Sequence, residues 1–150
     1  MQTNREADIR VLNSLIETTV DSINGYRDSA EHTDDADLKA MFRTRAGERE
    51  KVASELRAKV RELGGQPEDE GTMLAKAHRA FLDLKSMIGS DRKRVIEEVE
   101  RGEDHIKDKF EAAMRSTEIS PDTQAVIRTC YGSVKAGHDE VSAMKHAQQR

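Results

Sequence analysis

Apolar residues recur at three- and four-residue steps over four long stretches of the chain, a spacing that puts them on one face of a helix. The first helix is predicted to begin at a capping box, Thr3 to Glu6, and to fade near Glu31. Its inward positions are Ile9, Leu12, Leu15, Ile16, Thr19, Val20, Ile23 and Tyr26. A second helix is predicted to start from an N-cap among residues 32–34 and to stop at Gly64 and Gly65, since glycine favours helix ends. Its inward positions are Leu38, Phe42, Arg45, Arg49, Val52, Leu56, Val60 and Leu63.

The second half of the chain repeats this arrangement. Ser90 and Asp91 cap a third helix with the inward positions Val95, Val99, Gly102, Ile106, Phe110 and Ala113. A fourth begins at Ser120-Pro121-Asp122, because proline suits the first helical position. Its inward positions are Val126, Cys130, Val134, Gly137, Val141 and Met144. Gly102 and Gly137 are expected on these faces because they allow neighbouring helices to approach closely.

The lengths of the connections predict how the helices are arranged. A few residues join the first helix to the second and the third to the fourth, so each pair should form an antiparallel hairpin. Residues 64–90 form a longer connection with a short amphipathic segment, whose apolar positions are Met73, Leu74, Ala77, Phe81, Leu84 and Ile88. Two hairpins joined by a long crossover that carries a short helix indicate an all-α, ferritin-like four-helix bundle. Residues 1–150 are expected to form a single domain.

Composition refines this prediction. Only 35% of the residues are hydrophobic and 36% are charged, but the two signs nearly balance, with a net charge of −4. This balance favours long helices with charged outer faces over a disordered chain. No run of about 18 apolar residues exists, so no membrane span is expected. The net negative charge offers no electrostatic attraction for nucleic acid.

The single cysteine, Cys130, cannot form a disulfide within the chain. Together with the lack of an apolar secretion signal near Met1, this indicates a cytoplasmic protein. Because Cys130 lies on the inner face of its helix without a histidine beside it, we interpret it as a small buried hydrophobe rather than a reactive thiol.

Several segments resemble those of a bacterial family of four-helix-bundle proteins that carry a domain of unknown function. They are LIETTVDSINGYRDSAE, GGQPEDEGT, AHRAFLDLKSMIG, ERGED and VKAGHDEV, which together extend over nearly the whole chain. The most specific are the Gly-Gly-x-Pro-Glu-Asp linker and the Glu-Arg-Gly-Glu-Asp box. The resemblance implies a ferritin-like fold and brings no established activity.

A ferritin-like bundle raises the hypothesis of a di-iron or di-manganese carboxylate centre. That chemistry requires one inward Glu from each of two helices and a Glu-x-x-His motif from each of the other two. The second helix has no histidine, and Lys135 stands three residues before His138 where the motif has Glu. Neither motif is present, which argues against such a centre. A non-standard set remains as the alternative, namely Glu48, Glu100, Glu103 and His138 with iron or manganese.

Charged residues occupy the inward positions where metal ligands would stand. Arg45 and Arg49 lie one turn apart on the second helix, Glu103 lies on the inner face of the third, and His138 lies at the edge of the fourth. A buried guanidinium needs an anionic partner. We therefore predict a buried charge network in which an arginine pairs with Glu103, Glu48 or Glu100, with His138 at its edge. The competing interpretation is that both arginines extend outwards and bury only their stems.

Two classes of function follow from these observations. The first is a non-catalytic helical protein, a stress-associated or self-associating interaction module, in which Met73, Phe81 and Met87 of the crossover either feed a dimer surface or simply cover the bundle. The second is a ferritin-like metal-binding oxidoreductase that uses the non-standard set. The lack of any catalytic constellation favours the first, with no cofactor, a homo-oligomer as one possible assembly and no assigned protein partner.

Overall fold

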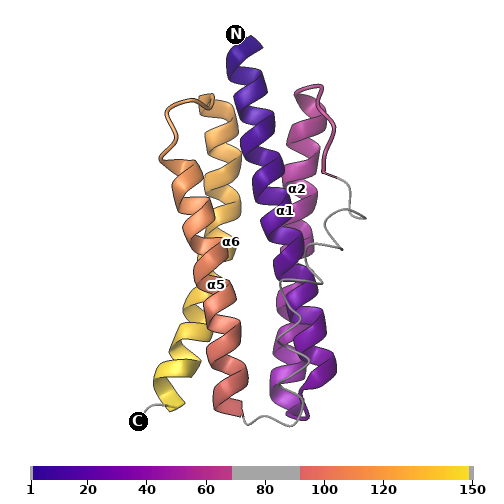
Figure 1. The fold of residues 1–150 in the computed structure, drawn as a ribbon, viewed down its shortest axis with the longest axis vertical. Helices are drawn as coiled ribbons and strands as arrows, with labels where there is room; N and C mark the ends of the chain where they lie inside the picture. The colour runs from indigo at the N-terminus through magenta and orange to yellow at the C-terminus, as the bar shows by residue number, and fades with distance from the viewer. Residues whose placement is uncertain (1, 69–91, 149–150) are drawn as a thin grey trace.

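The computed structural model describes residues 2–68 and 92–148, and within these residues the chain is helical, with no strand (Figure 1). The helices are α1 (Gln2–His32), α2 (Ala36–Glu62), α5 (Arg92–Met114) and α6 (Pro121–Gln148). The prediction of four long helices is confirmed. The short helix predicted in the crossover, its apolar residues and the Asp91 cap lie outside the described residues. None of the helices described is long and apolar enough to cross a membrane.

Local capping chemistry sets the ends of α2. Its N-cap is Asp35, whose carboxylate accepts a hydrogen bond of 3.0 Å from the Leu38 backbone N–H. The prediction of an N-cap among residues 32–34 is therefore wrong by one residue, because α1 continues to His32. At the other end, Gly64 adopts a φ of +83°, and the Gly65 N–H bonds to the Val60 carbonyl. The predicted stop at the glycine pair is confirmed.

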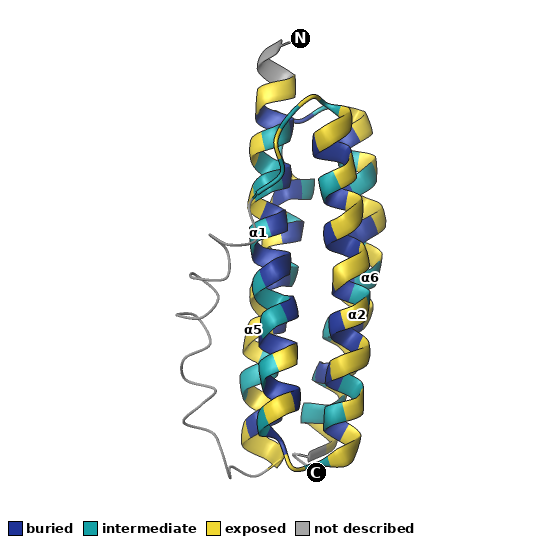
Figure 2. Ribbon diagram, turned by 90° about the vertical axis from the view of Figure 1, so that its right-hand side faces the viewer, coloured by how far each residue is buried: buried dark blue, intermediate teal, exposed yellow. Residues whose placement is uncertain are grey.

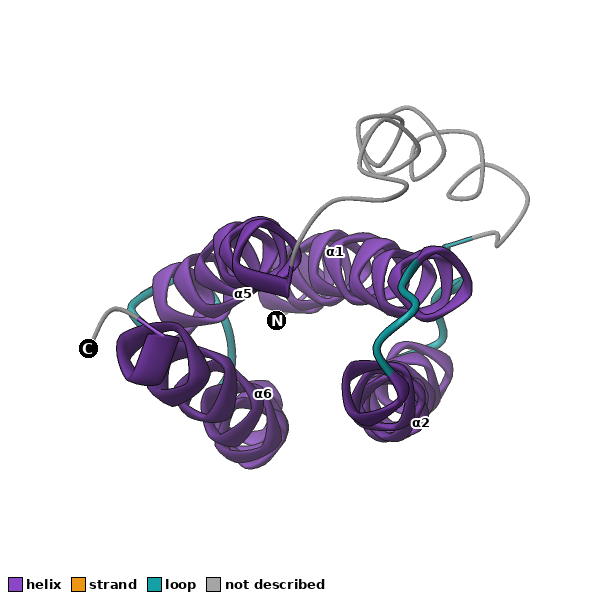
Figure 3. Ribbon diagram, turned by 90° about the horizontal axis from the view of Figure 1, so that it is seen from below, coloured by secondary structure: helices purple, strands orange, loops and turns teal. Residues whose placement is uncertain are grey.

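The four helices form two hairpins, α1 with α2 and α5 with α6, that lie side by side (Figure 3). Between the hairpins, α1 contacts α5 and α2 contacts α6. Arg92, the first residue of α5, forms an ion pair of 2.6 Å with Asp35 at the turn between α1 and α2. The Gln66 carbonyl accepts from Asn13 near the start of α1. The chain therefore leaves α2 at one end of the molecule and enters α5 at the opposite end.

The interior consists of two apolar clusters, which the inward faces of the helices enclose (Figure 2). One lies towards the start of α1 and includes Leu12, Leu56, Phe110 and Ile127. The other lies towards its end and includes Tyr26, Leu38, Phe42, Ile96 and Val141. Between the two clusters, the inward positions of α2, α5 and α6 hold charged or small residues. These residues, Arg45, Arg49, Glu103 and Gly137, form the candidate site.

Most of the predicted inward positions are buried. Gly102 is exposed, and five others are only partly buried, namely Ile9, Leu63, Val99, Val126 and Met144. A Cβ added at Gly102 would meet nothing within 4 Å, so the prediction that it faces inward is wrong. The reason is its place one residue before Glu103, which takes the inward position itself. Val126 is only half-buried, whereas its neighbour Ile127 is fully buried.

Candidate functional site

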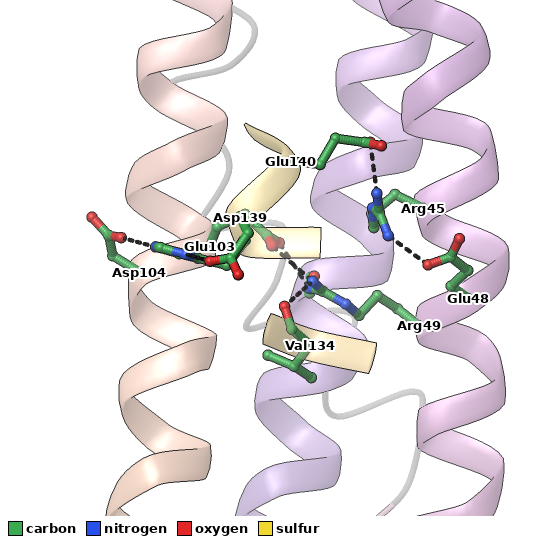
Figure 4. Close-up of polar contacts among 10 residues, drawn as sticks. Arg45, Glu48, Arg49, Glu103, Asp104, Val134, Asp139 and Glu140 are labelled. Atoms are coloured by element: carbon green, nitrogen blue, oxygen red, sulfur yellow. Dashed lines mark hydrogen bonds and ion pairs between the residues drawn. The ribbon is translucent and has the colours of Figure 1, made fainter. Parts of the chain in front are cut away.

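Arg49 is the largest fully buried side chain in the described part of the molecule. It projects from the inward face of α2 to α5, where Glu103 is 2% exposed. The guanidinium donates to both carboxylate oxygens, with distances of 2.8 Å from Nη1 to Oε1 and 2.7 Å from Nη2 to Oε2 (Figure 4). Such a bidentate pair is the strongest and most directional form of ion pair that arginine makes. It links the two hairpins through the centre of the core.

The same guanidinium reaches the remaining two helices. Nη1 also donates to the Ser22 hydroxyl of α1 at 2.7 Å, and Nη2 to the Val134 carbonyl of α6 at 3.4 Å. Its Cζ lies 5.8 Å from the centre of the Tyr26 ring, within cation–π range. One side chain of α2 therefore contacts the other three helices.

Arg45, one turn earlier on α2, faces α6 at the edge of the core. It donates to Glu48 at 2.5 Å and to Glu140 at 2.6 Å. Burial lowers the pKa of Arg45, but the bond to Glu140 and the charge of Glu48 outweigh it, and the net shift is upwards. Its side chain is 7% exposed, whereas that of Glu140 is 48% exposed, so the second pair extends from the core to the surface.

Gly137 of α6 makes room for both arginines. A Cβ at this position would lie 2.6 Å from Nη2 of Arg49 and 3.0 Å from Cδ of Arg45. The prediction that Gly137 faces inward is confirmed, whereas the predicted reason, close approach of neighbouring helices, is not what its surroundings show. The close neighbours are the arginine side chains rather than another helix backbone.

His138 forms a separate contact between α6 and α5. Its Nε2 lies 2.7 Å from the Asp104 carboxylate, and its Nδ1 lies 3.3 Å from that of Asp139. Burial lowers the pKa of His138, yet the two carboxylates outweigh this effect and raise it above its usual value. His138 follows Gly137, the residue that contacts Arg49, but its own partners are Asp104 and Asp139 rather than Glu103.

The residues of the proposed metal set do not converge. Glu48 pairs with Arg45, Glu103 with Arg49, and Glu100 with Lys145 at 2.8 Å. Each carboxylate therefore has its own cationic side chain. Across residues 2–68 and 92–148, no group of three or more His, Cys, Asp or Glu side chains is placed to hold a metal ion.

Two polar contacts that sequence reasoning missed lie beside this site and at the end of the bundle. Glu140 binds Arg45, as described above. Asp8 is 2% exposed and accepts hydrogen bonds from the Ser120 backbone and hydroxyl and from the Thr123 hydroxyl, at 2.7–2.8 Å. Asp8 stands four residues before Leu12 on the inward face of α1, and this spacing is the signal that could have revealed it.

Cys130 is buried in the first apolar cluster, as predicted. Its Sγ donates to the Glu55 carboxylate at 3.3 Å. Burial, followed by the bond to Glu55, raises the pKa of Cys130 to about 12. The thiol is therefore protonated at neutral pH and is a poor nucleophile.

Comparison with known proteins provides a family but no activity. Residues 7–116 match the model of a domain of unknown function, DUF2383. No curated protein matches the chain.

Proposed function

The chain belongs to the DUF2383 family, a domain of unknown function, and on that basis we propose that it is a non-catalytic, single-domain ferritin-like bundle that acts by association. The proposed partner is a second copy of the chain or another cytoplasmic protein, and the proposed setting is a stress response. The same proposal excludes a resident metal from the centre of the bundle.

The ferritin-like part of the proposal rests on topology. The two hairpins pack with antiparallel neighbours, and α2 ends at the opposite end of the molecule from the start of α5. A four-helix bundle with one long crossover has this connectivity, and an up-down-up-down bundle with short loops does not.

The non-catalytic part rests on one observation, the position of Arg49. A dinuclear carboxylate centre would occupy the middle of a ferritin-like bundle. Here a permanently charged guanidinium, 0% exposed, takes that place and binds both oxygens of Glu103, the most deeply buried carboxylate of the candidate set. A divalent cation would have to displace it and share the space with a like charge.

Metal analysis of the full chain tests this proposal. Protein purified without chelators should contain less than one iron or manganese per chain, and titration with Fe²⁺ in air should give no ferroxidase turnover. Two irons bound per chain would overturn the proposal in favour of the oxidoreductase that uses Glu48, Glu100, Glu103 and His138.

Sedimentation of the same sample tests self-association. A monomer–dimer equilibrium that shifts with protein concentration is the expected result. A strictly monomeric chain at all concentrations would leave a different protein as the partner and would contradict the homo-oligomer.

A further inference from the structure

A cavity of about 260 Å³ lies between α1 and α5, on the side of the molecule away from Arg45. Tyr26 and Glu103 line the cavity, so it adjoins the candidate site. Residues of α1 and α5 form the described walls of the cavity, and they combine hydroxyl groups with apolar side chains.

The two walls differ in chemistry. The α1 wall presents hydroxyl groups, those of Thr18, Ser22, Tyr26 and Ser29. The α5 wall presents the apolar side chains of Val99 and Ile106 on either side of Gly102. Because Gly102 has no side chain and a Cβ there would meet nothing within 4 Å, the opening beside it is clear.

One of the hydroxyls is buried without a hydrogen-bond partner in the described part of the chain. Tyr26 is 4% exposed, and its hydroxyl has no hydrogen-bond partner within the described residues. Ser29, one turn further along α1, is 5% exposed. Buried polar groups are nearly always hydrogen-bonded, so the unpartnered Tyr26 hydroxyl beside the cavity points to a ligand that supplies an acceptor.

Charge limits the kind of ligand. At the inner end the charges of Arg49 and Glu103 neutralise each other, and at the rim Arg101 pairs with Glu98. Asp21 and His105 also line the cavity, and a negatively charged group would lose its hydration beside the Asp21 carboxylate. Burial and the Glu103 charge also hold the pKa of Tyr26 well above its usual value, so the phenol keeps its proton and can donate it.

We propose that this cavity binds a small neutral organic molecule of one or two rings that carries an oxygen acceptor. The rings would pack on Val99 and Ile106, and the acceptor would face the hydroxyls of α1. Size agrees with this class, since an engineered cavity of about 150 Å³ holds benzene and this one is about 260 Å³. The proposal goes beyond association with a protein partner and does not depend on it.

The test uses coumarin, a neutral bicyclic lactone, as the probe on the full ¹⁵N-labelled chain. Coumarin should shift the amide resonances of residues along α1 and α5 that line the cavity. Coumarin-3-carboxylate, which has the same rings and a negative charge, should cause no such shifts. Absence of shifts with millimolar coumarin, or equal binding of the charged analogue, would overturn the proposal.

Two substitutions locate the binding. Gly102→Leu fills the opening and should weaken coumarin binding by about tenfold or more, whereas Gly132→Leu, at an exposed glycine of α6 with nothing near its Cβ, should leave it unchanged. Circular dichroism checks that both variants fold. Tyr26→Phe removes a hydroxyl that has no partner, so it should leave the melting temperature unchanged and weaken coumarin binding by about tenfold. Binding that survives both Gly102→Leu and Tyr26→Phe contradicts the assignment to this cavity.

Discussion

Arg49 shows how much one residue can determine about the interior. A buried charge is tolerated only with a partner, and the bidentate contact with Glu103 meets that condition at the cost of removing both groups from water. The pair therefore contributes little to net stability, and its main effect is to fix how α2 and α5 are placed relative to each other. Its removal is costly mainly because of the charge that would be left behind.

Arg49→Met should lower the free energy of unfolding by about 3–5 kcal/mol, because Glu103 keeps a buried charge without a partner. The double substitution Arg49→Met with Glu103→Leu should recover most of that loss. Urea denaturation measures both. Arg27→Met is the control, since Arg27 pairs with Glu50 on the surface and is 56% exposed; its effect should stay below about 1 kcal/mol. An unchanged midpoint for Arg49→Met contradicts the role of Arg49 as a counter-charge.

Gly137 should respond to substitution in the opposite way to an ordinary helical glycine. Gly132→Ala should stabilise the chain by up to about 1 kcal/mol, since its Cβ meets nothing and alanine favours helix. Gly137→Ala should instead destabilise it by about 1–3 kcal/mol, because the Cβ displaces the Arg49 guanidinium. Thermal melts of the two variants compare them directly. Equal stabilisation of both would show that Arg49 has another position to occupy.

At the scale of elements, three helix ends are attached to a neighbouring element by a specific polar contact. Arg92 attaches the start of α5 to the α1–α2 turn, Asn13 attaches the chain beyond α2 to α1, and Asp8 attaches the start of α6. Helix N-termini expose backbone N–H groups that favour a negative charge. Asp8 provides that charge from a different helix, so it acts as a cap and as a link between α1 and α6.

Asp8→Ala should cost about 1–3 kcal/mol of stability, because the hydroxyls of Ser120 and Thr123 lose their buried acceptor. Asp122→Ala, an exposed acid in the first turn of α6, is the matched control and should cost less than about 1 kcal/mol. Amide hydrogen exchange should show faster exchange in the first turn of α6 for Asp8→Ala only. Equal losses of stability in the two variants would mean that Asp8 acts only through its negative charge and not through its hydrogen bonds.

His138 makes the contact between α5 and α6 dependent on pH. Because its folded pKa is raised above the unfolded value of 6.5, the contact with Asp104 stabilises the fold fully below that value and is lost as pH rises through the folded pKa. Lys107 opposes and Asp139 reinforces the charge on the imidazole. His138→Gln should therefore reduce the loss of stability between pH 6 and pH 8, measured by urea denaturation at each pH. The same slope in both proteins contradicts this role.

At the scale of the whole molecule, Cys130 reports on opening of the core. Its thiol is buried, and with a pKa of about 12 it presents almost no thiolate at neutral pH. Reaction with a thiol reagent at pH 8 should therefore require unfolding, and its rate should rise with urea in parallel with the loss of helix. The urea-unfolded chain provides the reference rate. Rapid labelling of the native protein would mean that the core opens locally around α6.

The sequence predicts the helices better than it predicts their partners. Apolar spacing locates all four described helices, because this signal is local. Spacing also placed Arg49 and Glu103 on inward faces, but three acids remained equally suitable as the arginine's partner. The choice among Glu48, Glu100 and Glu103 depends on helix rotation and on which helices are neighbours, and neither is encoded locally.

The same limit explains the remaining differences. Gly102 and Glu103 are adjacent, and a rotation of a few tens of degrees decides which one faces the core. Glu140 and Asp104 were not assigned to Arg45 and His138 because both acids lie on exposed faces of their helices. Asp8 was overlooked because an acid on an apolar face has a role only when the start of α6 is placed beside it.

The ion pair between Arg49 and Glu103 joins the α1–α2 hairpin to the α5–α6 hairpin. If two chains exchanged hairpins, α1 and α2 of one would meet α5 and α6 of the other, and every contact across that boundary would form again between chains. Such domain swapping needs no new surface. The Arg49 guanidinium would then bind Glu103 of its own chain in a monomer and Glu103 of the other chain in a swapped dimer. The concentration of the protein would decide which of the two forms predominates.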